Sequence, residues 1–175
     1  KHSTISSLIP NQSFHLGSFS KTLAPSLRIG WIRASQELIQ SLLVIKESID
    51  LHSCGISQYI LDEYLSNDEN YKKHLNNLRK NYKIQMEFFA QTLQEELPQF
   101  HFSKPKGGMF IYGNLDTNTS ELVLKAIKEK VVFVPGSEFY NEHKRYNEIR
   151  FNFTHSTLDE IKEGIQRIKN LLVMK

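Results

Sequence analysis

The sequence has 175 residues, of which 39% are hydrophobic, and a formal net charge of +3. This length and composition suit one or two folded domains rather than a disordered chain, and no like-charge block is long enough to act as a nucleic-acid-binding arm. No apolar run is long enough to span a membrane, and the lone Cys54 cannot form an internal disulfide, so we expect a cytoplasmic protein.

The first half of the chain predicts two short strands followed by helices. The segment before the strands, residues 1–12, is polar and predicts a loop that could contain a short turn. Apolar segments bounded by turn formers predict the strands, and apolar residues spaced by three or four predict the helices, the first capped by Ser35. The predicted elements are strands at 14–17 and 29–33 and helices at 35–51, 56–65 and from Asn67 to Leu97. The apolar spacing of the last segment favours a packed helix that links two domains, rather than a coiled coil.

Beyond Pro98 the pattern alternates between strand and helix. A capping box between Thr157 and Glu160 marks the start of the last helix. The predicted elements are strands at 100–103, 109–115, 131–134 and 149–153, turns at 104–108 and 135–138, and helices at 120–130 and from Thr157 onward. We expect a small α/β domain with helices packed on one side of a sheet.

The stretch Gly-Ser-Phe-Ser-Lys-Thr-Leu-Ala-Pro-Ser-Leu-Arg-Ile-Gly-Trp at residues 17–31 places one lysine between two serines and an arginine. The hydroxyls of Ser18 and Ser20 and the guanidinium of Arg28 could together hold a phosphate near Lys21. The positive charge of Arg28 would also favour loss of the Lys21 proton, which a nucleophilic amine requires. A short Ser-x-Ser-Lys pattern by itself is more often only a solvated turn.

The longer string resembles the lysine segment of pyridoxal-phosphate (PLP) enzymes of the aspartate aminotransferase fold, known as fold type I. Its sequence is most similar to the corresponding segment in the class I/II branch, which contains 2-aminoadipate and kynurenine aminotransferases and the MocR-type regulators. The resemblance implies that Lys21 forms the Schiff base with PLP and moves the substrate proton. It also implies that Ser18, Ser20 and Arg28 bind the cofactor phosphate.

Arg150 lies within the predicted strand 149–153 among apolar neighbours, where an arginine needs an anionic partner. That partner could be a carboxylate ligand. It could equally be Glu138 or Glu148, or Arg150 could point to solvent from an edge strand. The segment resembles the arginine that binds the substrate α-carboxylate in these enzymes, and the resemblance favours the ligand.

Two further segments resemble parts of the active site in this family, whereas the histidines predict no site of their own. Residues 106–110 (Lys-Gly-Gly-Met-Phe) resemble the hairpin that opens the small domain near the active-site mouth, and residues 132–139 resemble the strand and turn that shape its pocket. The seven histidines show no i, i+4 pair on one helix and no accompanying cysteine cluster, so no metal site is expected. A Gly-x-Ser-x-Gly hydrolase elbow is also absent from the sequence.

In the resembled family, the aromatic residue that stacks on the cofactor and the Asp that protonates its ring both precede the lysine by many residues. Only twenty residues precede Lys21, and they contain no acid. We therefore expect the C-terminal part of a longer protein, inactive by itself. The expected organisation is a large-domain remnant at 1–51, linking helices at 52–97 and a small domain at 98–175.

Two main functions of the parent protein remain open. One is an aminotransferase that moves an amino group between an α-amino acid and a 2-oxo acid, working as a homodimer. The other is the PLP-sensing domain of a MocR/GntR-type regulator, whose DNA-binding part would lie outside this segment. A weaker alternative is a pseudoenzyme that keeps Lys21 for structure only. No contact of this segment with nucleic acid or membrane is expected.

Overall fold

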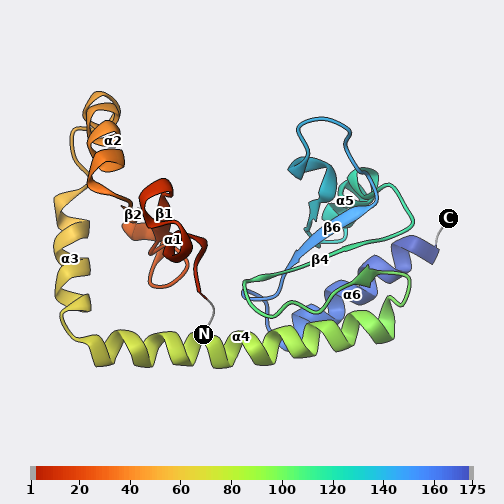
Figure 1. Cartoon of the computed structure of the whole chain (residues 1–175). Coiled ribbons are helices and arrows are strands. Elements are labelled where there is room, and N and C mark those ends of the chain that lie inside the picture. The colour runs from red at the N-terminus through yellow and green to blue at the C-terminus, as the bar shows by residue number, and fades with distance from the viewer. Residues whose placement is uncertain (1–2, 174–175) are drawn as a thin grey trace. The chain divides into compact units, whose positions relative to one another are not determined.

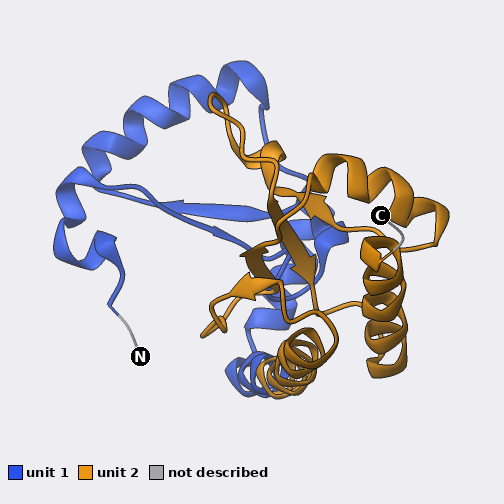
Figure 2. Cartoon of the chain, turned by 90° about the vertical axis from the view of Figure 1, so that its right-hand side faces the viewer, with its two compact units in different colours: residues 1–76 blue, residues 77–175 orange. Residues whose placement is uncertain are grey.

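The structure is a computed structural model that describes residues 3–173 (Figure 1). The chain divides into two compact units, residues 1–76 and 77–175, which Figure 2 shows in separate colours. Residues 1–2 and 174–175, which belong to the first and last predicted domains, lie outside the described residues. The domain boundaries at 51/52 and 97/98 remain predictions. Between residues 3 and 173, no helix combines the length and apolar character needed to cross a membrane.

The first unit contains a two-stranded antiparallel ribbon and several helices. Its elements are α1 (Ile5–Leu8), η1 (Pro10–Gln12), β1 (His15–Ser18), η2 (Pro25–Leu27), β2 (Gly30–Arg33), α2 (Gln36–Ile49) and α3 (Gly55–Leu65). The two predicted strands are confirmed and pair with each other. The segment at residues 1–12, predicted as a loop that could contain a short turn, has two short helical turns, α1 and η1. There, local bonds such as Ser7 N–H to the Thr4 carbonyl close short helical turns, which are too brief to leave a periodic apolar pattern.

The apolar stripe predicted for α2 does not form a core. Ser35 is the N-cap residue as predicted, although its side chain makes no capping hydrogen bond. No residue of α2 is buried, and Leu61 of α3 is the one buried residue among positions 3–76. Helices α2 and α3 are thus correctly predicted as elements, but apart from Leu61 their apolar residues are half-buried or exposed.

The long helix α4 (Asp68–Glu96) begins in the first unit and continues into the second. Its start is capped as predicted, because Asn67 Oδ1 accepts hydrogen bonds from the backbone N–H groups of Glu69 and Asn70, both at 3.2 Å. Burial along α4 is confined to its last two turns, where Phe89 and Leu93 enter the core of the second unit.

The second unit is built on a four-stranded antiparallel sheet of order β3-β4-β6-β5. Its elements after α4 are β3 (His101–Phe102), β4 (Phe110–Asn114), α5 (Thr119–Lys128), β5 (Val134–Pro135), η3 (Gly136–Phe139), β6 (Glu148–Asn152) and α6 (Leu158–Val173). One face of the sheet carries Ile111, Ile149 and Phe151, all buried with the apolar residues of α4, α5 and α6. The predicted α/β fold, with helices on one side of a sheet, is confirmed.

Aromatic rings fill the centre of this core. The rings of Phe89, Phe100 and Phe133 each lie edge-on to Phe151, with centroids 5.4 to 5.6 Å apart. Edge-to-face rings stabilise a core beyond the area they bury. The other face of β4 and β6 is left for polar residues, and the candidate substrate arginine lies there.

The buried strand predicted at residues 131–134 is wrong, because β5 contains only Val134 and Pro135. Residues before it form the exit from α5: Lys130 takes a left-handed conformation (φ 58°), and the Val131 N–H bonds to the carbonyl of Ala126 at 2.9 Å. This is the bonding pattern of a helix C-terminus. Val132 is consequently 76% exposed. The two valines at 131 and 132 therefore belong to the end of helix α5 and not to a strand.

The capping box predicted for the last helix is confirmed. The Glu160 carboxylate accepts the backbone N–H of Thr157 at 2.7 Å, and the Thr157 hydroxyl accepts the backbone N–H of Glu160 at 3.3 Å. The hydrogen bonds from the Thr157 N–H and hydroxyl hold the pKa of Glu160 below its ordinary value. The local sequence thus determines where α6 begins.

Candidate functional site

The ribbon of β1 and β2 carries the Lys21 loop at one end. Ser18, the last residue of β1, pairs with Gly30, the first of β2. A further backbone bond, from the Phe19 N–H to the Ile29 carbonyl at 3.1 Å, extends the pairing into the loop. The two arms of the loop therefore lie side by side where they leave the ribbon.

The loop closes on itself through backbone hydrogen bonds. The carbonyl of Phe19 accepts the N–H groups of Leu23 at 2.8 Å and Ala24 at 3.1 Å. After the short helix η2, Arg28 takes a left-handed conformation (φ 54°), and its Nη1 donates to the Pro25 carbonyl at 3.3 Å. These contacts turn the chain back, so that Arg28 rejoins the ribbon opposite the arm that carries the two serines.

The pairing thus brings all four predicted cofactor-binding residues to one end of the ribbon. Ser18 Oγ accepts the backbone N–H of Ser20 at 3.2 Å, and this leaves the hydroxyl hydrogens of both serines able to donate. Lys21 is exposed, and no acceptor among residues 3–173 engages its ammonium. The first acid of the sequence is Glu37. The loop end thus offers two hydroxyls, a guanidinium and an ammonium, and no acid is near them in the sequence. This set of donors fits a phosphate group.

Arg150 lies on β6, an inner strand between β4 and β5, so the edge-strand alternative is wrong. Its guanidinium carbon lies 4.3 Å from the ring centroid of Phe110 and 4.5 Å from that of Phe139. Its Nε is buried and has no hydrogen-bond partner among the described residues. A guanidinium held by aromatic faces, with a donor left unpaired, can receive a planar carboxylate.

The ion-pair alternatives for Arg150 are also wrong. Within the described part of the chain, neither Glu138 nor Glu148 forms an ion pair or hydrogen bond with it. The carboxylate of Glu138 lies 3.5 Å from the Ser137 hydroxyl. The carboxylate of Glu148 has other partners, described next. Arg150 thus has no anionic partner among residues 3–173.

Glu148 is the centre of a polar cluster on the same sheet face. Its Oε2 accepts the hydroxyls of Tyr112 at 2.7 Å and Tyr140 at 2.8 Å, and Arg145 Nη1 lies 3.4 Å from its Oε1. Burial alone would raise the pKa of Glu148, but the two tyrosine hydrogen bonds and the Arg145 charge hold it below its ordinary value. Loss of hydration, followed by the bond to Glu148, raises the pKa of Tyr112 well above its ordinary value. Glu148 is therefore a carboxylate at neutral pH, and the phenol of Tyr112 that binds it is neutral.

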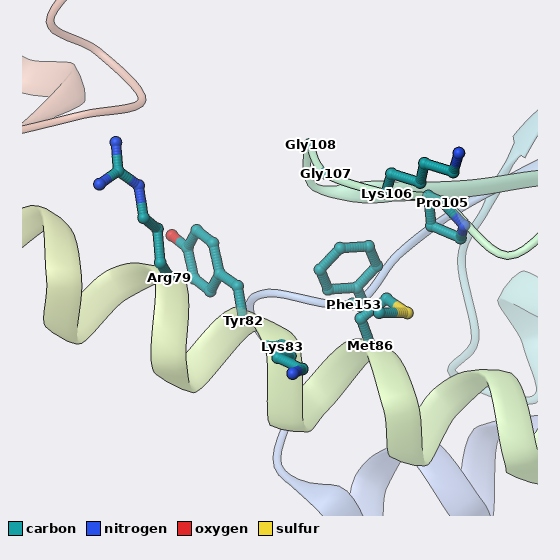
Figure 3. A pocket seen from close by; sticks show the side chains of 9 residues that line it. All are labelled: Arg79, Tyr82, Lys83, Met86, Pro105, Lys106, Gly107, Gly108 and Phe153. Atoms are coloured by element: carbon teal, nitrogen blue, oxygen red, sulfur yellow. The ribbon is translucent and has the colours of Figure 1, made fainter. Parts of the chain in front are cut away.

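The hairpin at residues 106–108 borders a separate cavity in the second unit, with a volume of about 480 Å³ (Figure 3). Gly108 takes a positive φ of 85°, as the predicted turn at 104–108 requires. The ring of Phe153 stands between α4 and the hairpin with Met86 beside it, and the ring of Tyr82 rises from α4 to one side of the hairpin tip. The hairpin predicted to lie near an active-site mouth thus borders a hollow with an apolar wall.

Sequence reasoning missed most of the surroundings of Arg150. Tyr112 lies directly across the β4–β6 pair from Arg150, and Phe110 is on the same face of β4. Phe139 and Tyr140 come from η3 and the residue after it. The alternation of side chains along β4 could have indicated which residues share the face of Arg150. Their partners from η3 depend on tertiary contacts.

Curated relatives include enzymes and a regulator. The aromatic-amino-acid aminotransferase 1 of Thermococcus litoralis is 36% identical over 88% of this chain, and the match covers 37% of that protein. The HTH-type transcriptional regulator NorG of Staphylococcus aureus is 34% identical over 88% of this chain and 35% of its own length. The chain spans well under half the length of these relatives.

Solved structures of aminotransferases also match this chain. The α-aminoadipate aminotransferase LysN of Thermus thermophilus, solved with N-(5′-phosphopyridoxyl)-L-leucine, matches with a TM-score of 0.85 and 30% identity. The match covers 93% of this chain and 43% of that one. The family described as aminotransferase class I and II matches residues 2–168. By this match and its aminotransferase relatives, the chain belongs to the class I and II aminotransferase family.

Proposed function

We propose that the whole protein is a PLP-dependent aminotransferase that moves an amino group between an α-amino acid and a 2-oxo acid. The proposal concerns the whole protein because this chain spans about two fifths of its relatives. PLP, when bound, supplies the electron sink that lets the substrate Cα lose a proton. The observation that carries the proposal is the loop end where Lys21 lies with Ser18, Ser20 and Arg28, in a segment of the sequence that contains no acid.

The residues of this loop have distinct roles in the proposal. Ser18, Ser20 and Arg28 hold the phosphate of the cofactor through hydroxyl and guanidinium hydrogen bonds. Lys21 would hold the cofactor covalently until the amino group of the substrate takes over that link, and the amine released in this way would accept the Cα proton as a general base and return it as a general acid. The exposed position of Lys21, with no acceptor around it among the described residues, leaves the amine available for both roles.

Arg150 binds the substrate α-carboxylate in this proposal. The rings of Phe110 and Phe139 cover the guanidinium, while the unpaired Nε remains for the ligand. A two-pronged ion pair with the carboxylate would orient the amino acid by geometry as well as charge. We expect the whole protein to work as a homodimer, as the resemblance implies.

Replacement of Lys21 tests the proposal directly. In the whole protein, Lys21→Ala should abolish covalent attachment of PLP, seen as loss of the reducible label after borohydride treatment and loss of the visible cofactor band. The reason is that only an amine can form the link. Lys46→Ala, a lysine in α2 of the same unit, is the matched control and should retain the label. Persistence of the label in Lys21→Ala would show that another residue carries it.

A second candidate function rests on the similarity to NorG, a transcriptional regulator by its name. In that case this chain would be part of a PLP-sensing domain, and a helix-turn-helix domain would lie elsewhere in the protein. Reading the coding sequence upstream of Lys1 distinguishes the two. A large domain without a winged helix favours the enzyme, whereas a winged helix and linker before it favour the regulator. Either result leaves the role proposed for Lys21 to its own test.

A further inference from the structure

The cluster of Glu148, Tyr112, Tyr140 and Arg145, here called the Glu148 cluster, lies on the same sheet face as Arg150. Glu148 and Arg150 are two residues apart on β6, so their side chains leave the same face of the strand. Tyr112 is paired with Arg150 across β4 and β6. An acid and an arginine that could form an ion pair are thus neighbours, yet the acid is bound by tyrosines.

The contacts around the carboxylate account for this choice of partner. Both tyrosine hydroxyls donate to Oε2 of Glu148, at 2.7 and 2.8 Å, and the side chain is 11% exposed. Gly136 makes room for the arrangement, because a Cβ at this position would overlap Cβ of Glu148 and lie 3.0 Å from the Tyr112 hydroxyl. The cluster is therefore closely built around the bound acid.

We propose that Tyr112 and Tyr140 act as positioning residues that withhold Glu148 from Arg150, so that the arginine stays available for the substrate carboxylate. This inference rests on the proposed role of Arg150. A buried carboxylate that loses its donors must find another cation or donor. Arg150 lies on the same face, and its buried Nε has no partner among the described residues. Without the phenols, Oε2 of Glu148 loses both of its donors while Arg145 stays at Oε1, and Glu148 then also pairs with Arg150 and competes with the substrate.

The test is the double variant Tyr112→Phe/Tyr140→Phe in the whole protein. Removing only the two hydroxyls keeps the rings and should raise the KM for the amino acid about tenfold or more, because a bound internal carboxylate competes with the substrate. The PLP affinity and the kcat at saturating substrate should change by less than about threefold. Adding Glu148→Gln should restore the KM, since the amide carries no charge to hold Arg150.

The rescue separates the proposal from a purely structural role. If the cluster only anchors η3 to the sheet, the triple variant would be at least as impaired as the double variant. An unchanged KM in the double variant would also overturn the proposal. Tyr146→Phe is the matched control, since Tyr146 is 51% exposed and its hydroxyl bonds to no described residue. It should leave the KM unchanged.

A measurement of the Arg150 resonance without substrate completes the test. It also includes a single variant, so that the proposal can still be tested if the double variant folds poorly. The Nε–H resonance of Arg150 should move in Tyr140→Phe, and further in the double variant, as an ion pair forms, and it should return when Glu148→Gln is added. An unmoved resonance would count against the inference. Arg150→Ala, measured alongside, tests the proposed function separately. Normal amino-acid binding in that variant would refute the role of Arg150, whereas weakened binding with a normal double variant would refute only the role of the tyrosines.

Discussion

Arg150 is a half-buried arginine that forms no ion pair with an acid in the described part of the chain. Its guanidinium lies against Phe110 and Phe139 at 4.3 and 4.5 Å, where cation–π attraction replaces part of the lost hydration. The sequence predicted that this residue needs an anion. The structure adds that the nearest acid in sequence, Glu148, is bound elsewhere.

Replacement of Arg150 should separate substrate binding from cofactor binding. In the whole protein, Arg150→Lys should raise the KM for the amino acid by about tenfold and Arg150→Ala by about a hundredfold, because lysine keeps the charge but cannot bind a carboxylate with two prongs. The PLP affinity should be nearly unchanged. Steady-state kinetics and cofactor titration measure the two effects. Arg167→Lys on α6 is the matched control, and equal loss of substrate and cofactor binding in Arg150→Ala would contradict the assigned role.

Among the elements, those with explicit end signals were predicted best. Asn67 caps α4 and the Thr157–Glu160 box caps α6, each through hydrogen bonds between residues close in sequence. The exit from α5 was misassigned because its C-terminal bond uses Lys130 in a left-handed conformation, which glycine would have indicated more clearly. Local chemistry predicts an element end only when the residue type is characteristic.

The capping box of α6 should make stability depend on pH in a definite direction. The pKa of Glu160 is lower in the fold than in the unfolded chain, so its contribution is present above the unfolded value of about 4.3 and is lost as pH falls through the folded value. Glu160→Gln should therefore lower the denaturation midpoint of the chain at pH 7, and the difference should shrink toward about pH 3. Chemical denaturation followed by circular dichroism measures it. Glu142→Gln, in an exposed loop, should show no such pH-dependent difference. A difference for Glu160→Gln that is constant with pH would contradict the charged cap.

At the scale of the whole molecule, the two units differ in the number of residues that they bury. The second unit buries sixteen residues in one cluster, from Phe89 to Ile168, whereas Leu61 is the one buried residue among positions 3–76. The first unit instead leaves large apolar side chains such as Trp31, Val44 and Ile49 exposed, at 41%, 70% and 79%. A two-stranded ribbon without a covering layer is marginal in water.

Hydrogen exchange of the 175-residue chain should reveal this difference. Amides of β4, β6 and α6 should be protected at least about a hundredfold more than those of β1, β2 and α2, because opening the second unit exposes its core. In the whole protein we expect protection of β1 and β2 to rise, since further chain could cover their apolar residues. Equal protection of both units in the 175-residue chain would contradict the assignment of the core. The paired strand β3 provides an internal reference at the sheet edge.

The sequence by itself determined most helices, most strands and the capping residues, because these depend on spacing, turn chemistry and short-range hydrogen bonds. The Lys21 segment was identified by its resemblance to a known family. Only the tertiary structure decided the surroundings of Arg150. Its aromatic partners come from β4 and η3, and the bonding of Glu148 to Tyr112 and Tyr140 joins residues 36 and 8 positions apart. Such contacts depend on strand register and packing, which no local pattern of side chains specifies.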